Sequence, residues 1–177
     1  MKPEESQLLI DALAFAALKH RDQRRKDPEA SPYINHPISL ARVLSVEAGL
    51  HDAELLAAAV LHDTLEDTQT TFEELRERFG KEVASVVREV SDDRTLLKPE
   101  RKRLQIEHAR HLSRRARLVK LADKICNIRD VAANPPRSWP LRRRREYFDW
   151  AKAVIDQIRG TNKTLEKLFD DAFAGRP

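Results

Sequence analysis

The chain has 177 residues, 35% of them charged and 41% hydrophobic, with a formal net charge of +4 and a pI near 9.3. These values are typical of a globular protein with a heavily charged surface, and no apolar run reaches the roughly 18 residues that would span a bilayer. The single cysteine, Cys126, excludes an internal disulfide and a cysteine-based zinc site, and together with an acidic N-terminus that lacks a secretion signal it predicts a cytoplasmic protein.

Helix-forming residues dominate the chain. Only 4 glycines are present, and long stretches are rich in Ala, Leu, Glu, Arg and Lys, which lose little side-chain freedom in a helix. No run alternates in the manner of a strand. We therefore expect an all-α fold, with residues 1–177 forming one domain.

The first predicted helix covers residues 5–21, where leucine and alanine recur with helical spacing. A polar loop over residues 22–35 follows. The next helix begins after His36-Pro37, because proline suits the first helical position, and it stops at Gly49. Since proline also restricts the residue before it, we expect His36 to be extended.

The third predicted helix covers residues 53–67 and is capped by Asp52. Its segment 55–61 is apolar on every side, and a helix of that kind is buried, so we expect it to run through the centre of the domain. Thr71 and Glu74 have the spacing of a capping box that opens a fourth helix. That helix ends at Gly80, and further helices are expected over residues 81–91, 99–112, 115–130, 140–159 and 162–173, with residues 115–130 forming a second core element.

An imidazole and three carboxylates gather at the end of the predicted central helix. On one continuous helix, His62 lies one turn from Glu66, and Asp63 one turn from Asp67. Burying such groups costs several kcal/mol unless they are paired, and a divalent cation is a suitable partner. A mixture of imidazole and carboxylate ligands suits Mn, Fe or Zn. This segment therefore predicts a metal site.

A His-Asp dipeptide alone is weak evidence, since chance gives roughly 0.5 such pairs in a chain of this composition. His51-Asp52 is a second copy, and its position before an apolar helix identifies Asp52 as an N-cap. His62-Asp63 differs because its helix is buried and because Glu66-Asp67 follows one turn later.

Two further residues could complete a metal site. His36 precedes a helix, and Asp123 lies in an apolar frame, with Asn127 and Asp130 on roughly the same helical face. Taken singly, each of the two is equally well explained by a structural role.

The order His…His-Asp…Asp resembles the metal-binding pattern of the HD superfamily of phosphohydrolases. The match is closer to one branch, the hydrolase domains of the Rel/Spo alarmone enzymes, and it covers nearly the whole chain. The segments similar to that branch are 33–37 (YINHP), 61–67 (LHDTLED) and 120–124 (KLADK), and those similar to its stand-alone, metazoan-type small alarmone hydrolases are 24–28 (RRKDP), 92–96 (DDRTL) and 146–148 (EYF).

This resemblance implies an HD-type helical bundle with a metal site in its core, formed by residues 32–130, and C-terminal helices over residues 140–173. It implies removal of the 3′-pyrophosphate from ppGpp or pppGpp, to give GDP and pyrophosphate from ppGpp, with one Mn²⁺ per chain. Bound metal would lower the pKa of water and polarise the phosphoryl oxygen. Because the bifunctional relatives carry a synthetase domain that these 177 residues lack, the resemblance also implies hydrolysis without synthesis.

The resemblance also assigns roles to individual residues. The metal ligands would be His36, His62, Asp63 and Asp123. Glu66 and Asp67 would orient or activate the attacking water. Phosphates and nucleoside would be held by Arg25, Lys26, Lys98, Asn127, Arg143 and Tyr147. Arginine and lysine suit this role because they neutralise pyrophosphate.

Several alternatives remain open at this stage. The same site could act on another phosphorylated nucleotide, such as NADPH or a deoxynucleotide, or the acidic segment could be a polar cluster without metal. The basic runs at residues 114–117 and 142–145 could bind nucleic acid, but that reading leaves the buried acidic cluster unexplained, so we expect solvated helix faces. We expect the same for His108 and His111. Oligomeric state cannot be read from the sequence.

Overall fold

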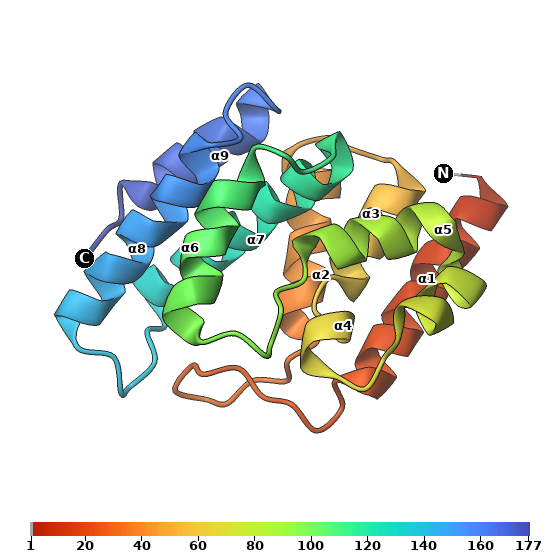
Figure 1. Cartoon of the computed structure of the whole chain (residues 1–177), viewed down its shortest axis with the longest axis horizontal. Coiled ribbons are helices and arrows are strands. Elements are labelled where there is room, and N and C mark those ends of the chain that lie inside the picture. The colour runs from red at the N-terminus through yellow and green to blue at the C-terminus, as the bar shows by residue number, and fades with distance from the viewer. Residues whose placement is uncertain (1) are drawn as a thin grey trace.

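The protein is described by a computed structural model that covers residues 2–177, so Met1, the first residue of the predicted domain, lies outside the described part. Apart from one isolated bridge between Arg24 and Pro32, its regular structure is helical, as predicted. The elements in chain order (Figure 1) are α1 (Pro3–Lys19), α2 (Asn35–Arg42), the π-helical turn η1 (Val43–Glu47), α3 (Ala53–Leu61), α4 (Thr64–Asp67), α5 (Phe72–Val90), α6 (Lys98–Ala109), α7 (Arg114–Ala133), α8 (Leu141–Asp156) and α9 (Lys163–Phe173).

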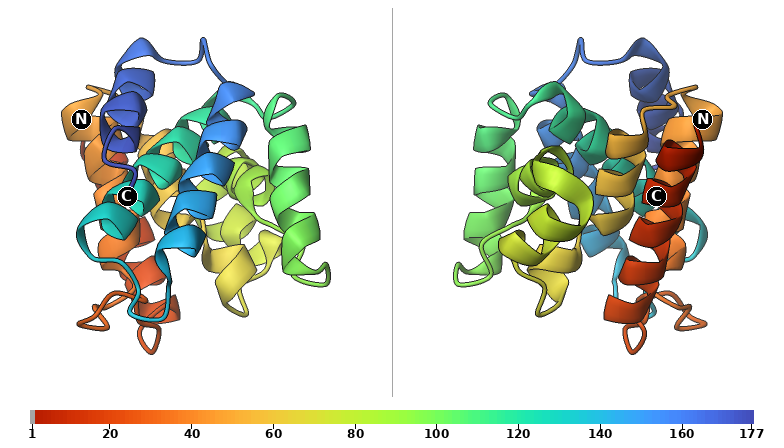
Figure 2. Two further views of the ribbon diagram at one scale, coloured as in Figure 1. Left: turned by 90° about the vertical axis from the view of Figure 1, so that its left-hand side faces the viewer. Right: turned by 90° about the vertical axis from the view of Figure 1, so that its right-hand side faces the viewer.

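Helix α3 is the centre of the bundle. It packs against α1, α2, α5 and α7, and every residue in it except Glu54 is buried. Figures 1 and 2 show α1 at one end of the molecule and α8 with α9 at the other, with α3 and α7 between them. Helix α3 is therefore buried, as its apolar composition on all sides predicts, because neighbouring helices cover each of its faces. Helix α7 is the second core element, with eleven buried residues along it.

The predicted helix over residues 53–67 is wrong in its length. Helix α3 ends at Leu61, and a separate short helix, α4, begins at Thr64. The buried hydroxyl of Thr64 donates a hydrogen bond of 2.7 Å to the carbonyl oxygen of Leu61, which gives that carbonyl a partner where the helical ladder stops. His62 and Asp63 consequently lie in the turn between two helices instead of one turn above Glu66 and Asp67 on a single helix.

The predicted extended conformation of His36 is also wrong, because His36 lies in the first turn of α2. Its N–H donates a hydrogen bond of 3.0 Å to the carbonyl of Tyr33, so the chain is already turning before Pro37. Proline is tolerated there because the first turn of a helix does not use its N–H groups. The helical region still stops at Gly49 as predicted, where φ is +66°.

Gly80 divides α5 into two helical segments. Its φ of +85° and ψ of 164° are not helical, so the prediction of one helix ending at Gly80 and another beginning at residue 81 is confirmed in the backbone.

At the start of α5, the Thr71 side chain accepts a hydrogen bond from the N–H of Glu74, whereas the Glu74 carboxylate pairs with Lys19. Only half of the predicted capping box is therefore formed.

Among residues 2–177, no helix is both long enough and apolar enough to cross a membrane.

Candidate metal centre and adjoining cavity

Four predicted metal ligands meet at the buried centre of the bundle. His36 comes from α2, His62 and Asp63 from the turn between α3 and α4, and Asp123 from α7. Ligand atoms of His36, His62 and Asp123 all lie within 4.8 Å of one another. Asp63 adjoins this group, with its Oδ2 2.8 Å from Nε2 of His62. Residues far apart in the sequence thus bring two imidazoles and one carboxylate into a common cluster, with the second carboxylate, Asp63, beside His62.

The His62 ring is oriented as a metal ligand requires. Its Nδ1 lies 2.8 Å from the carbonyl oxygen of Ala59, and a carbonyl only accepts, so Nδ1 carries the hydrogen and Nε2 presents a lone pair. Nε2 is buried and makes no hydrogen bond to the nearby Asp63, since an Nε2 lone pair and a carboxylate oxygen are both acceptors. An imidazole lone pair left unpaired beside two carboxylates fits a divalent cation.

Neighbouring side chains hold both carboxylates in place. The Tyr33 hydroxyl donates a hydrogen bond of 2.5 Å to Oδ2 of Asp63. Asn127 donates through Nδ2 to Oδ1 of Asp123 at 2.5 Å, and Lys124 donates to Oδ2 at 3.0 Å. Supporting groups of this kind orient the ligands of metal sites.

The protonation states also suit a cation. Burial alone would raise the pKa of Asp63, but the nearby His62 outweighs it and the pKa lies below its usual range. The pKa of Asp123 is likewise lowered against burial, chiefly by Lys124 and His36. Burial lowers the pKa of His36 and favours the neutral form that binds a metal. At His62 the two carboxylates outweigh burial and raise the pKa, so a cation bound there would displace a proton from Nε2. The centre therefore holds more negative charge than its own imidazoles neutralise.

Glu66 and Asp67, the predicted acidic pair, project from α4 toward the same centre. The Glu66 carboxylate accepts hydrogen bonds from Arg94 (3.1 Å), Arg101 (3.2 Å) and the backbone N–H of Asp92 (3.1 Å). Arg94 also pairs with Asp67. Burial is the largest cause of a raised pKa at Glu66, which favours its acting as a proton acceptor nearer to neutral pH.

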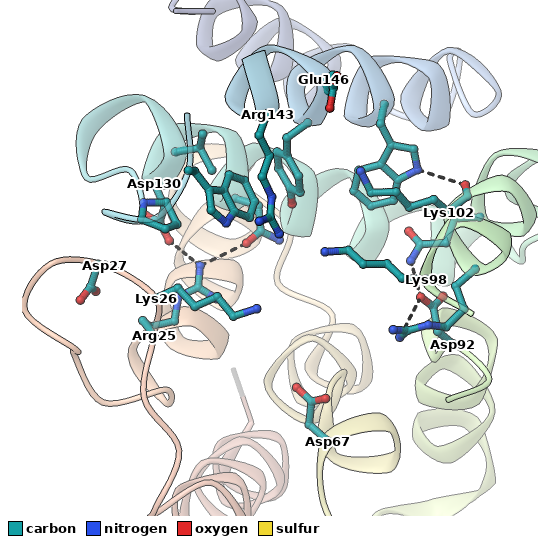
Figure 3. Close-up of a pocket in the computed structure, with 18 of the residues that line it drawn as sticks. Arg25, Lys26, Asp27, Asp67, Asp92, Lys98, Lys102, Asp130, Arg143 and Glu146 are labelled. Carbon is teal, nitrogen blue, oxygen red and sulfur yellow. Dashed lines mark hydrogen bonds and ion pairs between the residues drawn. The ribbon is translucent and has the colours of Figure 1, made fainter. Parts of the chain in front are cut away.

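Two connected cavities adjoin this centre. The inner one, of about 290 Å³, is lined by the four predicted ligands and by Glu66. The outer one, of about 1070 Å³, shares Arg25, Asn127 and Tyr147 with the inner cavity and opens between α6 and α8, as Figure 3 shows. All six residues predicted to hold the nucleotide line the outer cavity: Arg25, Lys26, Lys98, Asn127, Arg143 and Tyr147.

Arg25 is linked to the metal centre through one side chain. Its guanidinium donates hydrogen bonds to Asp130 (2.7 Å) and to Oδ1 of Asn127 (3.1 Å). Asn127 in turn donates to Asp123. The amide of Asn127 therefore spans a predicted phosphate-binding residue and a predicted metal ligand.

Several residues of the cavity were missed by sequence reasoning. Trp150 lines the cavity, and its indole N–H donates to the Lys102 carbonyl at 3.0 Å. Trp139 lies on the same wall, and its ring is 5.5 Å from that of Tyr147. Arg101, Lys102 and Gln105 also line the cavity and were not predicted. They lie on the same helical face as the predicted Lys98, and this spacing could have identified them.

The second His-Asp pair, the other histidines and the basic runs lie outside the metal centre. Asp52 accepts a hydrogen bond from the N–H of Leu55 and caps α3, so the second His-Asp pair is a helix cap as predicted. His108 and His111 are exposed. In the basic runs, Arg115 pairs with Asp52 and Arg142 with Glu146.

Comparisons with known proteins agree with this geometry. The family model described as HD domain matches residues 12–149. Proteins named guanosine-3′,5′-bis(diphosphate) 3′-pyrophosphohydrolase MESH1 are similar along nearly the whole chain. The protein from Xenopus tropicalis is 54% identical, with 96% of this chain and 94% of the relative aligned, and that from Homo sapiens is 53% identical, with 97% and 96% aligned.

Two solved structures are similar to this chain in fold. One, described as a metazoan orthologue of SpoT that hydrolyses ppGpp and plays a role in starvation responses, superposes with a TM-score of 0.93 at 51% identity, covering 96% of this chain and 95% of that one. A Listeria monocytogenes protein superposes with a TM-score of 0.61 at 27% identity, covering 78% of this chain and 99% of that one.

Proposed function

The chain belongs to the HD domain family, and on that premise we propose that it is a metal-dependent hydrolase that removes the 3′-diphosphate of ppGpp or pppGpp. The observation that carries this proposal is the position of the buried His-Asp centre at the inner end of a cavity whose wall is lined with cations and aromatic rings. The cations would neutralise the charge of the phosphate groups, and the aromatic rings would provide an apolar surface for the purine base.

We propose that His36, His62, Asp63 and Asp123 hold one divalent cation, and that this cation is Mn²⁺. The deprotonated Asp123 and the unpaired Nε2 of His62 support a divalent cation, and Mn²⁺ is the one that the family resemblance implies. A bound divalent cation would polarise the scissile phosphoryl group and lower the pKa of water at the site.

The chain's own residues would carry out the remaining steps. Glu66, assisted by Asp67, would position a water molecule and accept its proton as the water oxygen bonds to the phosphorus attached to O3′. The bond between phosphorus and O3′ then breaks, and O3′ takes up a proton to give the 3′-hydroxyl of GDP. Arg25 and Lys26, which line both cavities, would neutralise the departing pyrophosphate.

The remaining nucleotide-binding roles follow from position in the cavity. Lys98 and Arg143 line only its outer part, where they would hold phosphate. Tyr147 and Asn127 line both parts, where they would contact the nucleoside.

We also propose that residues 1–177 form a single domain, which is supported by one continuous hydrophobic cluster that takes in residues from Ala12 to Phe169. Within it, residues 32–130 would form the metal-site core, and residues 140–173 the C-terminal helices. The cytoplasmic location and the lack of synthetase activity stay predictions of the sequence.

The products of the reaction test the proposal directly. With Mn²⁺ and ppGpp, we expect equimolar GDP and pyrophosphate, because cleavage at O3′ releases the diphosphate intact. Anion-exchange chromatography of the nucleotides, together with a pyrophosphate assay, measures both products. Release of orthophosphate, or turnover of NADPH or dNTPs with ppGpp left intact, would assign the site to a different HD chemistry.

The support that Tyr33 gives to Asp63 yields a second expected result. In Tyr33→Phe the hydrogen bond to Oδ2 of Asp63 is lost, and we expect Mn²⁺ to bind about 10- to 100-fold more weakly, as is usual when a supporting group is removed. Titration with Mn²⁺, followed by the paramagnetic resonance of the free ion, gives the dissociation constant. An unchanged dissociation constant would show that Tyr33 is not a support for a metal ligand, and equal melting temperatures of the two chelated proteins would exclude a general loss of stability.

A further inference from the structure

His20 is a buried histidine that lies beside the metal centre without belonging to its predicted ligands. It follows the last residue of α1, it is only 2% exposed, and it lines neither cavity. It is therefore out of reach of a nucleotide bound in the cavities. No step of the proposed reaction uses it.

The hydrogen bonds around His20 fix which of its ring nitrogens carries the hydrogen. Gln23 donates through Nε2 to the backbone carbonyl of Asp67 at 2.6 Å, so the Oε1 of its amide is left as an acceptor. Nδ1 of His20 lies 2.7 Å from that Oε1 and therefore donates to it. Burial is the largest cause of a lowered pKa at His20, which favours the neutral ring with a lone pair on Nε2.

This Nε2 lone pair is buried and, within residues 2–177, has no hydrogen-bond partner. A buried polar atom without a partner is unfavourable and calls for an explanation in a native structure. A phenylalanine would fill the space of His20 without leaving such an atom. Packing alone therefore does not account for an imidazole, and the explanation has to come from the contacts that its ring face and its Nδ1 hydrogen make.

The Nδ1 hydrogen of His20 acts on the acidic pair through Gln23. Asp67 is the last residue of α4, a helix of only four residues, and the last carbonyl groups of a helix have no partner within it. The Gln23 amide is a partner for one of them, and His20 holds that amide. Figure 1 shows the end of α1 next to α4. This link therefore anchors the short helix that carries Glu66 and Asp67.

The ring of His20 acts on the metal centre through Tyr33. The centroids of the two rings are 4.9 Å apart, and their planes are inclined by 33°, so the rings lie against each other. The backbone supports this contact, because the N–H of Tyr33 donates to the carbonyl of Gln23 at 3.2 Å. The Tyr33 hydroxyl in turn donates to Oδ2 of Asp63. His20 thus fixes the side chain that orients a predicted metal ligand.

We propose that His20 is a positioning residue with two separable roles. Through Gln23 it holds the acidic pair of α4, and through Tyr33 it holds the predicted metal ligand Asp63. The inference rests on the proposed function, because that function assigns the acidic pair to water activation and Asp63 to the metal. One buried side chain would thereby set the position of the base relative to the cation, and the rate of a positioned reaction depends strongly on such a distance.

Two variants separate these roles, because each keeps one contact of the imidazole. His20→Phe keeps a ring against Tyr33 and removes the Nδ1 hydrogen, whereas His20→Asn keeps an N–H donor near the position of Nδ1 and removes the ring. With saturating Mn²⁺ and ppGpp, we expect His20→Phe to lower kcat about 10- to 100-fold, with the Mn²⁺ dissociation constant within about twofold of normal. We expect His20→Asn to weaken Mn²⁺ about 10-fold and to keep kcat at saturating Mn²⁺ within about threefold.

Hydrogen exchange reports on the acidic pair without any substrate. The N–H groups of Asp67 and Thr68 donate to carbonyl groups one turn earlier, at 2.8 and 3.2 Å, so both amides exchange when α4 opens. We expect their exchange to be about 10-fold faster in His20→Phe and unchanged in His20→Asn. The paramagnetic resonance of free Mn²⁺ gives the dissociation constant, which is also independent of turnover.

Control variants exclude a general loss of stability. Lys19→Met removes an ion pair of 3.0 Å with Glu74 from the residue next to His20, and it should lower only the Tm. In the double variant His20→Phe/Gln23→Leu, kcat should fall no further than in the more impaired single variant, since one residue acts through the other. If His20→Phe folds poorly, Gln23→Leu breaks the same link from its other side and carries the same expectations.

The outcomes distinguish this inference from the proposed function. If His20→Phe and His20→Asn lost kcat and Mn²⁺ affinity in equal proportion, or if neither variant changed, the positioning roles of His20 would be wrong. If ppGpp were not hydrolysed while exchange and Mn²⁺ binding still separated the two variants, His20 would keep its roles and the proposed reaction would fall. If ppGpp were hydrolysed and the two variants behaved alike, the inference alone would fail.

Discussion

Replacing Asp63 by alanine is expected to remove the bound metal and to lower kcat/KM for ppGpp by at least about 1,000-fold, because electrostatic stabilisation of the transition state depends on the cation. Asp63 lies 2.8 Å from Nε2 of His62, which has no other partner, so its carboxylate is well placed to complete the ligand set. The loss would be measured as metal per chain by elemental analysis and as steady-state turnover. A variant that keeps a full equivalent of metal and normal activity would remove Asp63 from the site.

The second His-Asp pair of the chain offers a matched control. Asp52→Ala removes an aspartate from the same dipeptide, but this aspartate caps α3, so we expect a loss of about 1 kcal/mol in stability and normal metal content. If Asp63→Ala folds poorly, Asp63→Asn keeps the shape of the side chain and provides the same comparison against Asp52→Asn.

Thermal unfolding reports on the same site without any substrate. A ligand present at 100 times its dissociation constant stabilises the folded state by about 2.7 kcal/mol, which for a chain of this length corresponds to about 5–10 °C in Tm. We expect a chelator to lower the Tm of the unmodified protein by this amount and to leave that of Asp63→Ala unchanged. A drop of equal size in both would place the metal elsewhere.

Replacing Glu66 by glutamine is expected to lower kcat by about 100- to 10,000-fold while the metal is retained, since this is the usual contribution of a positioned acid or base. The amide keeps the size of the side chain and can still accept hydrogen bonds from Arg94 and Arg101, but it cannot take a proton from water. Metal analysis and single-turnover kinetics with ppGpp separate this effect from that of Asp63→Ala.

Glu47 provides a closely matched control for Glu66. Its side chain is 18% exposed against 17% for Glu66, and it too pairs with two arginines, Arg42 and Arg129. It lines neither cavity, so Glu47→Gln should cost only stability and leave kcat unchanged. If the two variants lost activity equally, or if Glu66→Gln stayed fully active, the catalytic role proposed for Glu66 would be wrong.

Local chemistry explains which features could be predicted from the sequence alone. The all-helical class, the buried helix α3, the cap at Asp52 and the break at Gly80 each depend on a short stretch of chain, because propensity, periodicity and capping act over a few residues. Burial of the segment that leads to His62-Asp63, together with the acidic pair that follows it, was enough to distinguish that pair from His51-Asp52. Nothing local singled out His36 or Asp123, and only the family resemblance brought them to the site.

The tertiary structure decided how those groups meet. The turn between α3 and α4 places His62 and Asp63 at the centre, and it exists because Thr64 gives the last carbonyl of α3 a partner, which competes with continuation of the helix. Contacts such as Tyr33 with Asp63 join residues thirty positions apart, and no periodicity encodes them.

The lining of the outer cavity is likewise a product of packing. Lys98 and Lys102 lie one turn apart on α6, but their position opposite Arg143 depends on how α6 and α8 pack. The sequence by itself thus determined the helices, the buried central segment and the residue types of a metal site. The convergence of ligands and cations on one cavity came from long-range packing, which local propensities do not specify.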